Sequence, residues 1–406
     1  MINVAVLGYG IVGSGVVEVI TKNNEQISQK AMDDVQVKYV LDLRKFPGDP
    51  VEKVLVHDYK VILEDPDVDV ICETMGGLNP AYEFSKEALR KGKSVCTSNK
   101  ELVAQHGPEL LQIARENHCN YLFEASVGGG IPIIRAISEC LTPEKIIKIE
   151  GILNGTTNYI LTKMASEGSN FEDVLQEAQD KGYAEKNPEA DVEGYDACRK
   201  IAILSSLMTQ RTVNYKEIYT EGITKITSTD FQYVNQMKKA IKLLATSMDV
   251  NGTIYAMVAP FIISRKHALY NVNDVFNAVF VKGNMLGDTM YYGQGAGKLA
   301  TASAVVADVI AAAKSKGENI PCYWMQEQIE LGSIEEFQCK FFARFKGSVE
   351  SIQPRLEKKF GEIEIVTLKN KVDEFAIITK VMSEKKFSDG VKDMKELITR
   401  IRMLEE

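Results

Sequence analysis

A glycine-rich turn after the first predicted strand limits the fold of this chain more than any other feature. The apolar run Ile2–Leu7 is typical of a strand, and Gly8, Gly10 and Gly13 follow it with G-x-G-x-x-G spacing. Gly8 permits the tight turn, Gly10 lets a pyrophosphate approach the backbone, and Gly13 lets the next helix pack on the strand. That helix, which begins near Val12, offers N–H groups to an anion. The pattern predicts a dinucleotide site with cofactor contacts at Gly8, Gly10, Ile11, Val12 and Gly13.

Short apolar strands alternate with helical patterns over roughly the first 125 residues. The predicted strands are Ile2–Leu7, Val35–Leu41, Val68–Glu73, Lys93–Thr97 and Cys119–Glu124. Strands separated by helices form βαβ units around a parallel sheet. We therefore predict an α/β fold that begins with a Rossmann-type, doubly wound dinucleotide-binding domain.

The remainder of the chain has a different order of elements. Its middle part mixes strands and helices, which predicts a second, α+β domain. The C-terminal part reads as βαββαβ, with strand Cys339–Phe345, helix Val349–Phe360, strands Glu362–Leu368 and Glu374–Met382, helix Asp389–Leu397 and strand Thr399–Met403. The predicted domains are 1–130 (completed by 295–320), 131–316 and 338–406, with a linker at 317–337.

Charge and composition exclude several classes of protein. The 406 residues include 48 Lys+Arg and 56 Asp+Glu, a net charge of −8, so we expect no nucleic-acid partner. No apolar run approaches the ~18 residues of a membrane span, so we expect no membrane association. The 7 cysteines are widely spaced and form no C-x-x-C pair, which predicts neither a disulfide framework nor a zinc site. The expected compartment is the cytoplasm.

The end of the second strand carries two residues that favour different cofactors. Asp42 can hydrogen-bond a ribose 2′-hydroxyl, as in NAD enzymes, whereas Arg44 can hold the 2′-phosphate of NADP. A solvated charged loop is an equally good interpretation of Arg44. The choice between NAD and NADP therefore stays open, with a small preference for NADP.

The segment Gly182–Lys200 has the densest set of polar residues in the chain. Asp196 and Lys200 are spaced i,i+4, so their side chains share one helix face. A surface ion pair is one interpretation. However, Lys200 directly precedes the apolar run Ile201–Leu204, which favours burial and makes this lysine a candidate general acid/base. The four histidines lie in no comparable setting.

Two further segments are candidate active-site loops. Lys100 follows the predicted strand Lys93–Thr97 at the sheet edge where ligands bind in open α/β folds. Residues 124–132 are dense in glycine, and Glu124 adds a carboxylate oxygen. This loop is either a site for a monovalent cation or a hinge.

Six ordered motifs resemble those of homoserine dehydrogenases over essentially the whole chain. They are GYGIVGSG at 8–15, TSNKELVA at 97–104, EASVGGGIPI at 124–133, GILNGTTNYIL at 151–161, GYAE…DVEGYDACRK at 182–200 and YGQGAGKLATASAVVADV at 292–309. The resemblance implies NAD(P)-dependent interconversion of L-aspartate 4-semialdehyde and L-homoserine, on the route to threonine and methionine. It also makes the middle part, 131–316, a substrate-binding and dimerisation domain. Because the edge strands of residues 338–406 can pair with a second copy, we expect a homodimer or homotetramer that associates through this part as well as through the middle domain.

The resemblance also implies roles for individual residues. Lys200 corresponds to the proton donor/acceptor, Lys100 to a second active-site lysine beside substrate and nicotinamide, and Asp196 to a catalytic-site carboxylate. The implied substrate contacts are Glu185, Asp191, Gly155 and Thr156. Gly297 is an implied cofactor contact, and Glu124 with the carbonyls of Val127, Gly129 and Ile131 is an implied sodium site.

Two departures from the family pattern affect these expectations. The position before Asp42 is Leu41 rather than a basic residue, which puts strict NADP use in doubt. The C-terminal unit resembles an ACT regulatory domain, but the turn at 344–348 reads RFKGS instead of Asp-x-Pro-Gly, so threonine feedback is open.

Two other functions remain as alternatives. A phosphorylating semialdehyde dehydrogenase would need an activated cysteine, for which Cys96 is the candidate. A non-catalytic, NAD-binding sensor of amino acids would leave the polar segment at 182–200 unexplained.

Overall fold

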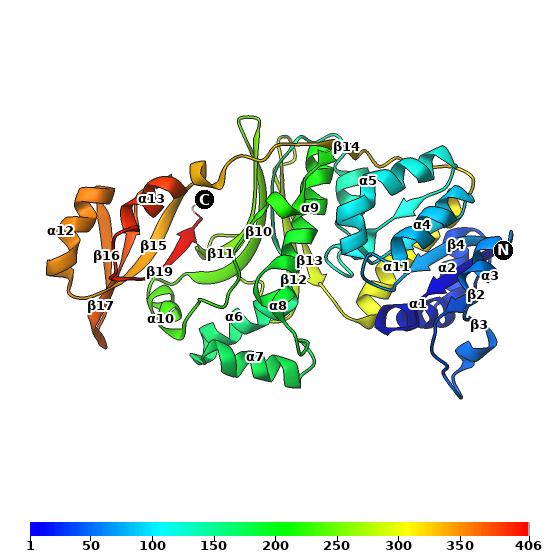
Figure 1. The fold of residues 1–406 in the computed structure, drawn as a ribbon, viewed down its shortest axis with the longest axis horizontal. Coiled ribbons are helices and arrows are strands. Elements are labelled where there is room, and N and C mark those ends of the chain that lie inside the picture. The colour runs from blue at the N-terminus through cyan, green and yellow to red at the C-terminus, as the bar shows by residue number, and fades with distance from the viewer. Residues whose placement is uncertain (405–406) are drawn as a thin grey trace. The chain divides into compact units, whose positions relative to one another are not determined.

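The computed structural model describes residues 1–404, which form two compact units (Figure 1). Unit 1 comprises residues 1–144, 202–215 and 291–329. Unit 2 comprises residues 145–201 and 216–290 and the described residues from 330 onward. Among the described residues, no helix is long and apolar enough to cross a membrane.

Unit 1 is built on a six-stranded parallel sheet of order β3-β2-β1-β4-β5-β6. Its strands are β1 (Ile2–Leu7), β2 (Val35–Leu41), β3 (Leu55–Val56), β4 (Val68–Glu73), β5 (Ser94–Thr97) and β6 (Tyr121–Leu122). The Rossmann-type prediction is confirmed. The last strand is shorter than predicted, because Glu124 already belongs to a 3₁₀ turn, Glu124–Ser126.

The helices of unit 1 are α1 (Ile11–Lys22), α2 (Asn24–Ala31), α3 (Tyr59–Glu64), α4 (Ala81–Arg90), α5 (Lys100–Glu116) and α11 (Lys298–Lys314). Helices α1 and α11 cross closely because Gly15 has no side chain: a Cβ there would lie 2.7 Å from the Lys298 carbonyl. The predicted linker after α11, residues 317–337, is packed at Trp324: a Cβ on Gly107 would lie 2.9 Å from the buried ring of this tryptophan. A short sheet pairs β14 (Met325–Gln328) with β8 (Arg211–Thr212).

Unit 2 is organised around a long mixed sheet of order β13-β12-β7-β10-β11-β19-β15-β17-β16. The strands before the C-terminal part are β7 (Ile146–Ile152), β9 (Tyr219–Thr220), β10 (Ala240–Val250), β11 (Thr253–Ile263), β12 (Phe276–Gly283) and β13 (Asp288–Gln294). The helices are α6 (Gly155–Glu167), α7 (Phe171–Asp180), α8 (Glu189–Val192), α10 (Ser228–Gln236) and α9 (Tyr195–Thr209), of which α9 runs on into unit 1 after Ile201. Strands β10 and β11 form a hairpin whose turn places Asn251 and Gly252 at positive φ, as a type I′ turn requires.

The C-terminal part has the predicted βαββαβ order. Its elements are β15 (Gln338–Lys346), α12 (Val349–Phe360), β16 (Ile363–Leu368), β17 (Lys371–Thr379), the short β18 (Met382–Ser383), α13 (Glu384–Val391) and β19 (Leu397–Met403). Strand β19 pairs in parallel with β11, so this part continues the sheet of unit 2.

The predicted position of the last helix, Asp389–Leu397, is wrong. Helix α13 begins at Glu384, because the hydroxyl of Ser383 caps it by accepting a hydrogen bond from the Lys386 amide. The helix ends at Val391, and Leu397 already belongs to β19.

Candidate active site

The glycine turn between β1 and α1 has the geometry of an anion site. Gly8 has φ +91°, and a Cβ on Gly13 would lie 1.8 Å from the Gly8 carbonyl, so both positions require glycine. Space around Gly10 is open, which leaves the backbone accessible. Helix α1 begins at Ile11, and the amides of its first turn have no carbonyl partners within the helix.

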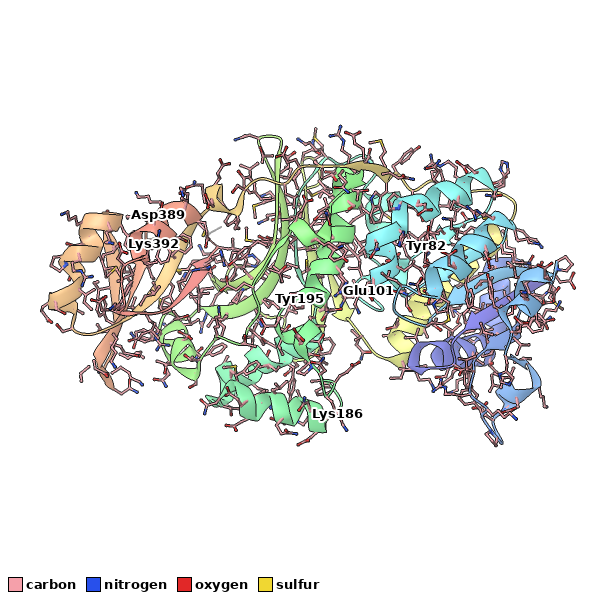
Figure 2. All side chains as sticks on the ribbon, in the orientation of Figure 1. Tyr82, Glu101, Lys186, Tyr195, Asp389 and Lys392 are labelled. Carbon is pink, nitrogen blue, oxygen red and sulfur yellow. The ribbon has the colours of Figure 1, made fainter. Side chains whose placement is uncertain are left out.

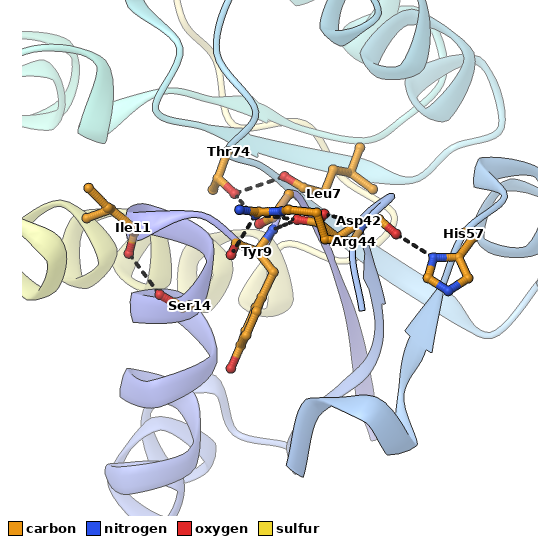
Figure 3. A network of polar contacts seen from close by, with 9 residues as sticks. Leu7, Tyr9, Ile11, Ser14, Asp42, Arg44, His57 and Thr74 are labelled. Atoms are coloured by element: carbon orange, nitrogen blue, oxygen red, sulfur yellow. Dashed lines mark hydrogen bonds and ion pairs between the residues drawn. The ribbon is translucent and has the colours of Figure 1, made fainter. Parts of the chain in front are cut away.

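A charged network lies beside this turn (Figure 3). The Tyr9 amide donates to Asp42 at 2.8 Å, and the guanidinium of Arg44 donates to both carboxylate oxygens of Asp42 at 3.0 and 2.8 Å. These hydrogen bonds, the one from Arg44 foremost, hold the pKa of Asp42 well below its usual value. Arg44 also donates to the Tyr9 carbonyl at 3.2 Å. Both candidate ribose contacts therefore lie together at the turn.

Lys200 and Asp196 form a buried ion pair on α9. The Lys200 Nζ donates to Asp196 Oδ2 at 2.7 Å and to the backbone carbonyl of Leu153 at 2.7 Å. Their side chains are 11% and 7% exposed, so the interpretation as a surface ion pair is wrong. The tip of the lysine is held at the end of β7, where the chain turns into α6.

Asn154, which the sequence analysis did not identify, joins this pair to a second carboxylate. Its Nδ2 donates to Asp191 Oδ1 at 2.7 Å and to Asp196 Oδ2 at 3.0 Å. Its Oδ1 accepts from the Thr157 amide, which caps α6 and fixes the amide's orientation. Burial and the nearby Asp196 charge raise the pKa of Asp191, which shows that the two carboxylates influence each other.

The remaining predicted substrate contacts fall into two groups. A Cβ on Gly155 would lie 2.7 Å from the Val275 carbonyl, and the hydroxyl of Thr156 donates to the Tyr183 carbonyl at 2.6 Å. Both therefore stand at the start of α6 beside Asn154. Glu185 lies in the exposed loop between α7 and α8, in which Figure 2 labels Lys186.

Lys100 is the first residue of α5, directly after β5. The Asn99 side chain caps this helix by accepting from the Leu102 amide, and its Nδ2 donates to the Gly77 carbonyl at 2.6 Å. Lys100 thus begins a helix whose start is fixed at the carboxyl edge of the parallel sheet. Gly297, with φ +119°, directly precedes α11 as its N-cap residue.

Two buried carboxyl groups meet after β6: Glu124 of the loop and Asp308 of α11. Glu124 accepts from the amides of Ile134 and Arg135, both at 2.8 Å, and its own amide donates to Asp308 at 2.9 Å. Arg135 pairs with Asp308 at 2.6 Å. Burial, followed by the charge of Glu124, raises the pKa of Asp308 to about 7. One guanidinium thus faces two carboxylates.

The other residues expected to hold a cation lie in the same loop. Gly128 and Gly129 have φ +74° and +55°, and Val127 is buried. The Ile131 carbonyl accepts from the Ile133 amide at 2.9 Å, which leaves one of its two lone pairs for a cation. A carboxylate and backbone carbonyls are oxygen ligands of the kind that a hard monovalent cation takes.

Cys96 is unsuited to nucleophilic catalysis. It is fully buried in β5, and this burial raises the pKa of its thiol well above the usual value. An attacking cysteine needs access and a lowered pKa. The structure therefore argues against the phosphorylating dehydrogenase.

Comparison with known proteins identifies the family. Two protein-family models match the chain. The family model described as homoserine dehydrogenase matches residues 132–310, and the one described as homoserine dehydrogenase, NAD binding domain, matches residues 8–124. The homoserine dehydrogenase of Bacillus subtilis is 38% identical over 412 aligned positions, which cover 98% of this chain and 95% of that protein. The chain belongs to the homoserine dehydrogenase family. It is an oxidoreductase that interconverts L-homoserine and L-aspartate 4-semialdehyde with a nicotinamide cofactor.

Solved homoserine dehydrogenases have the same fold. The structure from Thiobacillus denitrificans has a TM-score of 0.91 at 33% identity and covers 100% of this chain and 98% of its own. A hyperthermophilic archaeal homoserine dehydrogenase in complex with NADPH has a TM-score of 0.66 at 27% identity, covering 79% of this chain and 99% of its own. Because the chain is an enzyme of this family, the predicted activity is confirmed and the alternative of a non-catalytic sensor is wrong.

Proposed function

We propose that Lys200 exchanges the proton in the homoserine dehydrogenase reaction. The observation that carries this proposal is the buried chain of hydrogen bonds from Lys200 through Asp196 and Asn154 to Asp191. In the reducing direction the cofactor supplies a hydride to the aldehyde carbon. Lys200 donates a proton to the carbonyl oxygen as negative charge develops there, and Asp196 and the Leu153 carbonyl hold its Nζ in place.

The carboxylates beside Lys200 bind the amino-acid end of the substrate in this proposal. Asp191 can accept from the substrate ammonium, and Asn154 holds its carboxylate in position. Gly155 and Thr156 line the same end of α6, and Glu185 contributes a further carboxylate from its loop. Lys100, at the start of α5, acts beside substrate and nicotinamide.

Spectrophotometric assays of the purified protein test this function. Oxidation of NADPH or NADH is followed at 340 nm with L-aspartate 4-semialdehyde, with and without inorganic phosphate. We expect turnover that does not need phosphate, with L-homoserine as the product. A requirement for phosphate in the oxidative direction, or no turnover with either cofactor, would contradict the proposal.

We infer that both cofactors are used, with NADP preferred. Arg44 supports NADP because its exposed guanidinium can grip a 2′-phosphate as a charge-assisted fork, whereas Asp42 supports NAD. The NADPH bound by the archaeal relative supports the same preference. The proposed cofactor contacts are Gly8, Gly10, Ile11, Val12, Gly13, Asp42, Arg44, Lys100 and Gly297.

We also propose a sodium site at Glu124 and the carbonyls of Val127, Gly129 and Ile131. The unbalanced carboxylates Glu124 and Asp308 support it. When sodium chloride replaces choline chloride at constant ionic strength, the melting temperature of the wild type should rise, whereas that of Glu124→Gln should not. Equal responses of the two proteins would contradict this site.

The C-terminal part, residues 338–406, is proposed to be an ACT-like domain with a structural role. Its strand β16 ends the sheet of unit 2, and such an edge can pair with a second copy, which supports a homodimer or homotetramer.

The free state of the seven cysteines supports a cytoplasmic location, and the reaction supports a place on the route to threonine and methionine.

A further inference from the structure

Glu221 is held by two arginines of the C-terminal strand. Its Oε2 lies 2.7 Å from Arg402 Nη1 and 3.2 Å from Arg400 Nη1, and it accepts from the Tyr219 hydroxyl at 2.9 Å. Arg402 is fully buried and also makes a two-pronged pair with Glu384. Burial raises the pKa of Glu221, but the two arginines outweigh it and lower the pKa, so this carboxylate is ionised.

The residues directly after Glu221 pack on the backbone of α8. A Cβ on Gly222 would lie 2.2 Å from the Val192 carbonyl, so the two chain segments touch without a side chain between them. The Ile223 amide donates to that same Val192 carbonyl at 2.8 Å. A shift of residues 222–223 would therefore change the packing at the end of α8.

Helix α8 carries Asp191, the carboxylate that Asn154 orients. The Gly194 amide donates to the Asp191 carbonyl at 3.0 Å, and the Thr224 hydroxyl donates to Glu193 at 3.0 Å. The four residues of α8 are too few to hold their own position as an isolated helix. Their placement depends on the segment that packs against them.

We propose that Glu221 is a positioning residue for the substrate carboxylate Asp191, and that Arg402 and Arg400 hold it in place from the C-terminal strand. The inference rests on the substrate role proposed above for Asp191. In physical terms, the arginines fix Glu221, Glu221 fixes the contact of residues 222–223 with α8, and that contact fixes Asp191. Small displacements of a substrate-binding group have large kinetic effects because the bound geometry must match the reacting one.

The variant Glu221→Gln tests this proposal, since it keeps the shape of the side chain and removes its charge. The matched control is Glu374→Gln. It removes the charge from a second buried ion pair of the C-terminal part, Arg344 with Glu374 at 3.2 Å. No hydrogen bond or ion pair described for Glu374 involves residues 221–223. We expect the KM for L-homoserine to rise about tenfold or more in Glu221→Gln, while the KM for the cofactor stays within about twofold. Glu374→Gln should keep both KM values.

Amide hydrogen exchange gives a readout that does not depend on activity. The Ile223 amide, protected by its bond to Val192, should exchange faster in Glu221→Gln and at the wild-type rate in Glu374→Gln. If Glu221→Gln does not fold, Arg402→Lys carries the same expectations, because a lysine keeps the charge but loses the fork to Glu221 and Glu384.

The outcomes separate this inference from the proposed function. Wild-type exchange at Ile223 in Glu221→Gln, or an equal rise of the homoserine KM in Glu374→Gln, would overturn the positioning role. An unchanged homoserine KM in Asp191→Asn would instead remove the proposed substrate role of Asp191, and exchange at Ile223 would then decide the inference alone.

Discussion

Lys200 and Asp196 lie one helical turn apart on α9 and form an ion pair of 2.7 Å with both side chains nearly buried. An exposed pair with this spacing contributes little, but here the surroundings exclude water, which strengthens electrostatic interactions. Asn154 extends the pair to Asp191, so that one asparagine orients two carboxylates around one lysine. In the mechanism proposed above, this arrangement sets the proton donor Lys200 beside the group that would bind the substrate ammonium.

Arg44 should decide cofactor preference. In Arg44→Ala the affinity for NADP should fall by the roughly 1.5–3 kcal/mol of a hydrogen bond to a charged group, or about 10- to 150-fold. The affinity for NAD should stay unchanged. Fluorescence titration with both cofactors measures this. Lys45→Ala serves as the control on the same loop, and equal losses for NAD and NADP in Arg44→Ala would show that the arginine only supports the loop.

Asn154 should matter for substrate binding as well as for catalysis. Asn154→Leu keeps the approximate size but removes both donors to Asp191 and Asp196, so the KM for L-homoserine should rise and kcat should fall, each by about tenfold or more. Steady-state kinetics in the oxidative direction measures both. Asn170→Leu, which replaces the asparagine directly before α7, is the control for the loss of an asparagine at a helix N-terminus. An equal change of the homoserine KM in both variants would contradict the role of Asn154 in orienting the two carboxylates.

Asp308 should give the unfolding free energy a distinct pH dependence. Its pKa is raised to about 7 in the folded protein, against about 3.9 in an unfolded chain, so the folded state binds more protons between these values. This contribution to stability is complete below about pH 4 and is lost as the pH rises through about 7. The difference in unfolding free energy between wild type and Asp308→Asn should fall with pH in this window, by up to about 1.4 kcal/mol per pH unit.

Urea unfolding at pH 4.5, 6 and 7.5 measures that difference, with the exposed residue Asp389 changed to Asn as control. A difference between wild type and Asp308→Asn that is constant over these pH values would show that Asp308 has an ordinary pKa.

L-Threonine should inhibit the full-length enzyme weakly or not at all. The segment 344–348, which joins the end of β15 to α12, lacks the aspartate that meets an amino-acid ligand in ACT domains. Its Arg344 is used in a buried pair with Asp230 at 2.7 Å. Inhibition curves with L-threonine at saturating and at KM levels of L-homoserine measure this. Inhibition at micromolar threonine would contradict the structural role of the C-terminal part.

The elements that local rules determine could be predicted from the sequence. Strands β1, β2 and β4 and helix α12, Val349–Phe360, follow from periodicity, and the structure has them at the predicted residues. Helix α13 was misplaced because its start depends on the cap at Ser383, which sits at the end of an apolar strand pattern. Boundaries of this kind are set by one hydrogen bond rather than by a periodic signal.

The missing parts of the candidate site depend on contacts between distant segments. Asn154 lies 37 residues before Asp191 and 42 before Asp196, and only the fold shows that they meet. Its cap position, directly before the helix of the motif GILNGTTNYIL, was a local signal that could have drawn attention to it. The pairing of Arg402 with Glu221, 181 residues apart, had no such signal.

The kinetic parameters of Lys200→Ala test the central claim most directly. Lys163→Ala, which removes an exposed i,i+4 ion pair with Glu167, is the matched control. If Lys200 is the proton donor, kcat should fall about 10²- to 10⁴-fold in Lys200→Ala while cofactor affinity stays near the wild-type value, and Lys163→Ala should keep wild-type turnover. A kcat for Lys200→Ala within about threefold of the wild type would contradict the assignment.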